Sequence, residues 1–183
     1  MTYTGADAGH GAAARERHGR RLFLGGPFKS LVDARTGVMS ATERNRILNL
    51  IERFEHAGYT VHNAHRREGW GADFLSPEEC TRLDFTEIRG CDVFVAYPGD
   101  PASPGTHIEI GWAAAFGKPI ILLLEEGADY AFLVRGLHAV ADVTYVRYSR
   151  VDAAGDGGRT FEDEVVVVVN EALERAATAP AEV

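Results

Sequence analysis

One glutamate, Glu109, stands where both a structural and a chemical role are open. It lies three residues after Thr106 in the stretch PASPGTHIEIGWA, which follows the apolar run CDVFVAYPG. The spacing Thr106-x-x-Glu109 is that of a capping box, in which a carboxylate only closes the start of a helix. In the first turn, however, the helix dipole also favours the ionised form. An ionised, partly shielded carboxylate is what displacement at a sugar carbon requires, so both interpretations stand.

The residues just before Glu109 are those of an anion site. Ser103, Gly105 and Thr106 supply two hydroxyls and an approachable backbone ahead of a helix N-terminus, the usual setting for a phosphate. Pro-Gly-Thr is also an ordinary turn and cap. Gly25 and Gly26, in GGPFKS, provide a second place where the backbone can approach a ligand. That segment has neither the glycine spacing of a dinucleotide fingerprint nor the Gly-Lys-Ser/Thr of a P-loop.

Metal-binding patterns are incomplete. His107-Ile108-Glu109 matches the H-x-E of zinc deaminases, but no P-C-x-x-C follows, because Cys80 and Cys91 both lie upstream. His62 and His65 are three residues apart on or after a strand, so they point in different directions. We therefore expect no metal and no cofactor.

Six further residues have two interpretations each. The run from His65 to Arg67 can meet an anion, although a solvated basic loop is the commoner arrangement. Phe28 and Trp70 can stack on a base or pack against the core. Asp84 is polar within an amphipathic helix, where a surface position is the simpler expectation.

Strands alternate with helices along the chain, which predicts a single α/β doubly wound, Rossmann-like domain with a five-stranded parallel sheet. We expect this domain over 20–177, with tails at 1–19 and 178–183 and a flexible connection at 151–159. Ligands bind such folds beyond the carboxyl ends of the strands, where the strand order reverses. The predicted strands are 20–26, 59–64, 91–97, 118–124 and 143–148; the predicted helices are 40–58, 76–90, 106–117, 129–138 and 161–177.

Composition limits the partners. A net charge of −8 argues against a nucleic-acid polymer, which needs a basic face, but not against a single nucleotide. No apolar run is long enough for a membrane span, and the first residues do not resemble a signal peptide. Two cysteines are too few for a disulfide framework. We expect a cytoplasmic protein that binds a small molecule.

Five segments together resemble the nucleoside 2-deoxyribosyltransferase superfamily, over about residues 22–148. These are FLGGPF, AHRREGWGADFLSP, TRLD, DVFVAYPGDPASPGTHIEIGWA and GKPIILLLE. Within the superfamily they are most similar to its nucleotide N-glycosidase branch, the CMP and 5-hydroxymethyl-CMP hydrolases that start the blasticidin S and mildiomycin types of nucleoside-antibiotic biosynthesis. The resemblance implies a homo-oligomer, at least a dimer, that hydrolyses CMP to cytosine and ribose 5-phosphate. A base-exchanging deoxyribosyltransferase and a non-catalytic nucleotide-binding module are the alternatives.

The resemblance also implies roles for individual residues. Glu109 matches the family's nucleophile, and Asp84 the acidic residue that holds the glutamate or sugar or helps the base to leave. Lys29 stands where the hydroxymethyl-preferring relative has arginine, which favours unmodified CMP. With the patterns above, the predicted phosphate site is Ser103, Gly105, Thr106 and Gly26, and the predicted base and ribose site is Gly25, Phe28, Lys29 and His65.

Overall fold

The fold is built on five parallel strands in the order β2-β1-β3-β4-β5. The computed structural model describes residues 19–28, 31–33, 35–149 and 159–178. The predicted α/β class with a five-stranded parallel sheet is confirmed. The strands are β1 (Arg21–Gly25), β2 (Thr60–His62), β3 (Val93–Ala96), β4 (Ile120–Glu125) and β5 (Val143–Tyr148).

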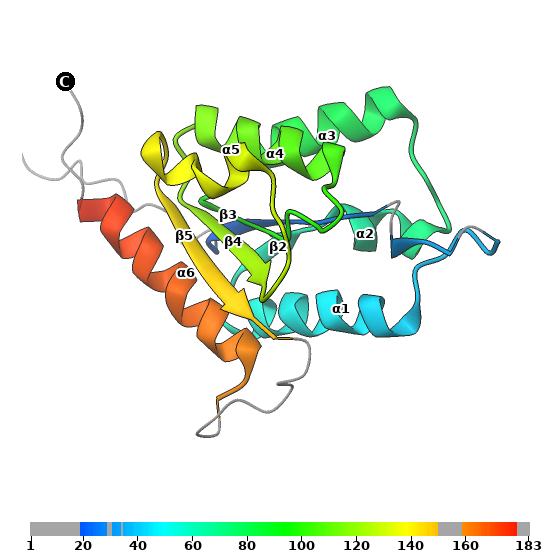
Figure 1. Ribbon diagram of the computed structural model, residues 1–183, viewed down its shortest axis with the longest axis horizontal. Helices are drawn as coiled ribbons and strands as arrows, with labels where there is room; N and C mark the ends of the chain where they lie inside the picture. Colours follow the sequence, from blue (N-terminus) through cyan, green and yellow to red (C-terminus); the bar gives the residue numbers. More distant parts are fainter. Residues whose placement is uncertain (1–18, 29–30, 34, 150–158, 179–183) are drawn as a thin grey trace, which may run out of the picture.

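Helices cover both faces of the sheet (Figure 1). On one face lie α1 (Ala41–His56) and α6 (Phe161–Thr178), and on the other α3 (Pro77–Gly90), α4 (Pro104–Ala115) and the short α5 (Phe132–Arg135). Alternate side chains of β1 enter opposite cores: Leu22 and Leu24 pack on the α1 and α6 side, Phe23 on the α3 and α4 side. Both faces are therefore apolar, as expected for a central parallel strand.

From β1 the chain continues to β2 on one side, then crosses to β3 on the other side of β1 and continues to β4 and β5. Strands β1 and β3 pair in register from Leu22↔Val93 to Gly25↔Ala96. The strand order reverses between these two neighbours, so their carboxyl ends form the crevice where such folds bind ligands. The segments that leave β1 and β3 border this crevice. After β2 the chain forms α2 (Ala64–Arg67) and a 3₁₀ turn, η2 (Gly69–Gly71), where we expected a loop.

Two predicted helices differ from the structure. The segment 129–138 holds only the one-turn α5 and part of a 3₁₀ turn, η3 (Leu137–Ala139), because Gly136 interrupts the pattern. The helix expected over 106–117 instead spans Pro104–Ala115. The valine-rich 161–177 is helical as predicted, extending to Thr178.

Within the described ranges, no helix combines the length and apolarity needed to cross a bilayer. Apart from Gly19, Thr178 and Arg159, the predicted tails and the 151–159 connection lie outside the described residues.

Candidate active site

A cavity of about 630 Å³ opens at the crevice between β1 and β3. Its wall is made by the end of β1, by α2, by the first half of α3 and by the start of α4. All the predicted site residues that the structure describes line it: Gly25, Gly26, Phe28, His65, Asp84, Ser103, Gly105, Thr106 and Glu109. Lys29 lies outside the described residues. Four segments spread over more than eighty residues thus meet at one place.

The start of α4 is not the predicted capping box. Ser103 is the N-cap: its Oγ accepts hydrogen bonds from the Thr106 backbone N–H, at 3.5 Å, and from Thr106 Oγ1, at 3.1 Å. Pro104 occupies the first helical position, which proline favours because its fixed φ suits a helix and no N–H is needed there. Thr106 is therefore in the first turn and Glu109 in the second. The capping role weighed for Glu109 is wrong.

Glu109 is placed beside the cavity by Gly25 at the end of β1. A Cβ at Gly25 would stand 2.8 Å from Glu109 Oε2, so only glycine leaves room for this carboxyl group. Oε2 is enclosed and has no hydrogen-bond partner among the described residues, although the residue as a whole is only half-buried. A buried polar atom without a partner is costly, which marks Glu109 as a residue whose placement serves a ligand.

The protonation of Glu109 differs from the expectation. Burial, followed by the nearby charge of Asp84, raises the pKa of Glu109 to about 8, and the charge of Arg67 only partly opposes this. In the second turn the carboxyl group is too far from the helix end to gain much from the dipole, which acts within the first turn. In the ligand-free protein at neutral pH, Glu109 therefore carries its proton.

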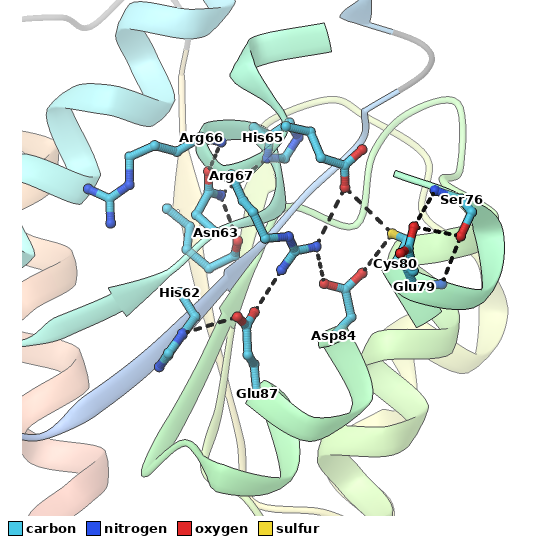
Figure 2. Close-up of polar contacts among 12 residues, drawn as sticks. His62, Asn63, His65, Arg66, Arg67, Ser76, Glu79, Cys80, Asp84 and Glu87 are labelled. Atoms are coloured by element: carbon cyan, nitrogen blue, oxygen red, sulfur yellow. Dashed lines mark hydrogen bonds and ion pairs between the residues drawn. The ribbon is translucent and has the colours of Figure 1, made fainter. Parts of the chain in front are cut away.

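Asp84 is buried at the cavity wall, so the surface position weighed for it is wrong, and it is held by a cation, Arg67, to which the sequence assigned no partner. Arg67 Nη2 lies 2.7 Å from Asp84 Oδ1, while Nη1 lies 2.9 Å from Glu87. Figure 2 shows the guanidinium reaching between the two carboxylates. Cys80 Sγ donates to Asp84 Oδ2 at 3.3 Å, so both oxygens of Asp84 have a partner. Asp84 is thus fixed at the cavity wall, close enough to raise the pKa of Glu109.

We expect Arg67→Met to lower the free energy of unfolding by about 2 kcal/mol, less than for a fully buried pair because Arg67 keeps some exposure. The reason is that Asp84 and Glu87 lose their shared cation. Urea unfolding at pH 7 measures the change. The matched control is Arg66→Met: Arg66 pairs with the exposed Glu55, so we expect a loss of about 1 kcal/mol or less. Equal losses in both variants would contradict the importance given to the Arg67 network.

His65 belongs to the cavity wall and not to a solvated basic loop. Asn63 Nδ2 lies 3.2 Å from His65 Nδ1, and His65 Nε2 lies 2.9 Å from the Pro27 carbonyl. An amide N–H₂ can only donate and a carbonyl can only accept, so Nδ1 accepts and Nε2 donates. Burial lowers the pKa of His65 to about 4. The imidazole is therefore neutral, with both nitrogens engaged and only its ring and edge toward the cavity.

Apolar rings form the outer wall of the cavity. Phe28 contacts His65 and Phe74, with ring centroids 4.7 and 5.1 Å apart, and Phe74 is half exposed. Trp112 of α4 also lines the cavity and packs edge-on against Phe85. Trp70 does not line the cavity and instead packs against the core. A planar ring therefore has an aromatic surface on which to lie.

Besides the exposed Thr81, sequence reasoning missed two polar residues of the wall, Glu68 and Cys80. Glu68 is 2% exposed and follows α2 directly. Burial, together with the charge of Asp84, raises the pKa of Cys80 to about 12, so its thiol is protonated. Neither residue belonged to a recognisable spacing. The only available signal was their place in the segments that follow β2 and open α3.

A comparison with protein-family models shows the family of this chain. The family model described as nucleoside 2-deoxyribosyltransferase matches residues 34–168, about three quarters of the chain. The chain belongs to the nucleoside 2-deoxyribosyltransferase family. The resemblance seen in the five sequence segments is thereby confirmed, and the matched range contains both Asp84 and Glu109.

Several solved structures are similar to this chain. BlsM is 50% identical, with a TM-score of 0.73 over 90% of this chain and 98% of that one. The CMP N-glycosidase BcmB of Clostridium botulinum is 40% identical, with a TM-score of 0.59 over 81% and 99%. A 2-deoxyribosyltransferase of Bacillus psychrosaccharolyticus is 19% identical, with a TM-score of 0.51 over 69% and 85%, a likeness of fold alone. No curated protein matches significantly.

Proposed function

We propose that this nucleoside 2-deoxyribosyltransferase family member hydrolyses the N-glycosidic bond of CMP, releasing cytosine and ribose 5-phosphate. The observation that carries the proposal is Glu109 Oε2, enclosed and without a partner beside a cavity large enough for a nucleotide. The likeness to BcmB, whose name gives it as a CMP N-glycosidase, supports the choice of substrate.

The proposed phosphate site is the start of α4. There the Gly105 backbone N–H has no hydrogen-bond partner among the described residues, and the Ser103 hydroxyl, which accepts from Thr106, keeps its own proton to donate; both residues line the cavity. A Cβ at Gly105 would meet no atom within 4 Å, so the backbone there is open to a close ligand. None of the described residues that line the cavity carries a cationic side chain. The helix end is therefore the anion-binding feature of the described wall.

With the phosphate at α4, the sugar lies against Glu109 and the base extends toward Phe28. Ionised Glu109 attacks C1′, its Oε–C1′ bond forms as the C1′–N1 bond breaks, and the base leaves and takes up a proton. Water then attacks C1′, restores the carboxylate and yields ribose 5-phosphate. Positive charge that develops on the sugar favours the ionised form of Glu109, so the carboxylate stabilises the transition state more than the ground state. Holding the phosphate keeps C1′ in place.

Activity is expected to rise with pH. If the ionised form of Glu109 reacts, its pKa of about 8 means that kcat/KM increases about 25-fold between pH 6.5 and 8.5 and then levels off. Asp84 and Arg67 are the charged groups that act on it, while His65, with a pKa of about 4, does not titrate in this range. Initial rates at low CMP concentration measure the profile. A flat profile, or one that falls with pH, would contradict an ionised nucleophile.

The test of the function is a chromatographic screen of ribo- and deoxyribonucleoside 5′-monophosphates for free base. We expect cytosine from CMP and much slower release from cytidine, which lacks the phosphate. Release of no base from any nucleotide would overturn the proposal. Because the family model is named for a base-exchanging activity, each reaction is repeated with an excess of a second free base. A product that carries the second base would identify a transferase.

A further inference from the structure

The end of the cavity where the proposed base lies offers mainly hydrogen-bond acceptors. Its described polar residues are His65, Glu68, Cys80, Thr81 and Asp84. Both nitrogens of His65 are already engaged, with Asn63 and the Pro27 carbonyl. The Cys80 thiol is directed at two carboxylates, Asp84 at 3.3 Å and Glu68 at 3.6 Å. Apart from the exposed hydroxyl of Thr81, which can donate or accept, a ligand at this end therefore meets carboxylate oxygens among the described groups.

Of the two carboxylates, only Glu68 has an oxygen without a partner. Asp84 accepts from Arg67 on Oδ1 and from Cys80 on Oδ2. Glu68 receives two contacts, from Arg67 Nη2 at 3.5 Å and from Cys80 at 3.6 Å, and both are long and on Oε1. Within the part of the chain that the structure describes, no hydrogen bond reaches Glu68 Oε2. The Glu68 side chain is 3% exposed and lines the cavity.

The backbone holds Glu68 in this position. Its N–H donates to the carbonyl of Ala64 at the start of α2, and its own carbonyl accepts from Gly71 and Asp73 in the turn that follows. The side chain therefore starts from a rigid point, which is what a residue that discriminates between ligands requires. Phe28 and Phe74, which line the same cavity and contact one another, supply the surface on which a planar ring can lie.

We propose that Glu68 reads the base: its Oε2 accepts a hydrogen bond from the exocyclic amino group of cytosine and so selects CMP against UMP. This inference rests on the proposed function. Cytosine presents an N4 amino donor where uracil presents the O4 acceptor, and carboxylates are the usual partners of that amino group. With uracil, two acceptors would face one another in a buried site and both would lose their hydrogen bonds. Discrimination of at least about 30-fold in kcat/KM follows.

The test is Glu68→Gln, measured as kcat/KM for CMP and for UMP. The glutamine amide can donate to uracil O4, which the carboxylate cannot. We expect the CMP-to-UMP ratio to fall at least about tenfold, through a lower value for CMP together with a higher value for UMP. The matched control is Glu87→Gln. Glu87 pairs with the same Arg67 but does not line the cavity, so this variant is expected to keep the wild-type ratio.

Three results would overturn the inference: a wild-type protein that cleaves CMP and UMP equally well, a Glu68→Gln variant in which both substrates slow by the same factor, or the same change of ratio in Glu87→Gln. If the wild-type protein releases no base from either nucleotide, the proposed function fails by itself. In that case, calorimetric binding of CMP and UMP to the same proteins decides whether Glu68 recognises the base. A preference for CMP that disappears in Glu68→Gln supports base reading, and equal wild-type affinities refute it. Thermal unfolding of each variant confirms that it is folded.

Discussion

Replacing Glu109 with glutamine is expected to lower kcat for CMP hydrolysis at least about 1,000-fold, because the amide cannot form the bond to C1′. The substitution keeps the size of the side chain, so CMP binding should change far less than kcat. Rapid-quench or steady-state assays of cytosine release measure the first quantity, and calorimetry with CMP the second. A folded Glu109→Gln protein that keeps a tenth or more of the activity would exclude Glu109 as the nucleophile.

Stability provides the control for this variant. The pKa of Glu109 is raised from 4.5 to about 8 in the folded protein, chiefly by burial. Between these two values the folded chain binds a proton that the unfolded chain has lost, so stability decreases as pH rises through this window. Glutamine has no titratable proton, so the Glu109→Gln variant does not lose stability in this way as the pH rises. We therefore expect Glu109→Gln to unfold at the same or a higher temperature than the wild type at pH 8, which separates lost chemistry from lost folding.

Gly25→Ala is expected to reduce kcat by about 10- to 100-fold while the protein stays folded, the loss that follows a displacement of about 1 Å in a reacting group. The new Cβ would stand 2.8 Å from Glu109 Oε2, and its next neighbours, Ala96 and Phe94, are at an ordinary 3.5 Å. The carboxyl group is the end of a flexible side chain, so it moves aside and the backbone does not. Steady-state kinetics with CMP, beside thermal unfolding, measures the two effects.

The matched control for Gly25→Ala is Gly111→Ala, the same chemical change on α4. A Cβ at Gly111 would meet no atom within 4 Å, and alanine suits a helix better than glycine does. Activity should be unchanged and stability equal or slightly higher. Wild-type activity in both variants would mean that the position of the Glu109 carboxyl group does not depend on the end of β1.

The start of α4 shows how two overlapping local signals are resolved. Thr106-x-x-Glu109 has the spacing of a capping box, but Ser103-Pro104 is also a helix start, and the structure uses it. The chain uses the same Ser-Pro start at Ser76-Pro77, where Glu79 completes a capping box. Proline is favoured at the first helical position, because its fixed φ suits a helix and no N–H is needed there, and this supports the earlier start. Releasing Glu109 from capping leaves it free to face the cavity.

The charges around Asp84 could not be assigned from the sequence. Arg67 and Asp84 are seventeen residues apart and meet only because α2 and α3 both lie against the crevice end of the sheet. Whether an arginine in a run of basic residues is solvated or buried depends on what packs over it. Arg66 next to it pairs with the exposed Glu55, whereas Arg67 reaches the cavity wall. Adjacent residues of one type thus have opposite environments.

Local patterns determined the parallel sheet, most of its helices and the gathering of Gly25, Ser103 and Glu109 at one end of it, because periodicity, caps and glycine positions act over a few residues. Tertiary structure alone decided that Glu109 is enclosed beside Asp84, that Arg67 holds Asp84, and that Glu68 lines the same cavity. Burial and charge pairing depend on contacts between segments far apart in the chain. They set the pKa values, and with them the chemistry, only after the layers have packed.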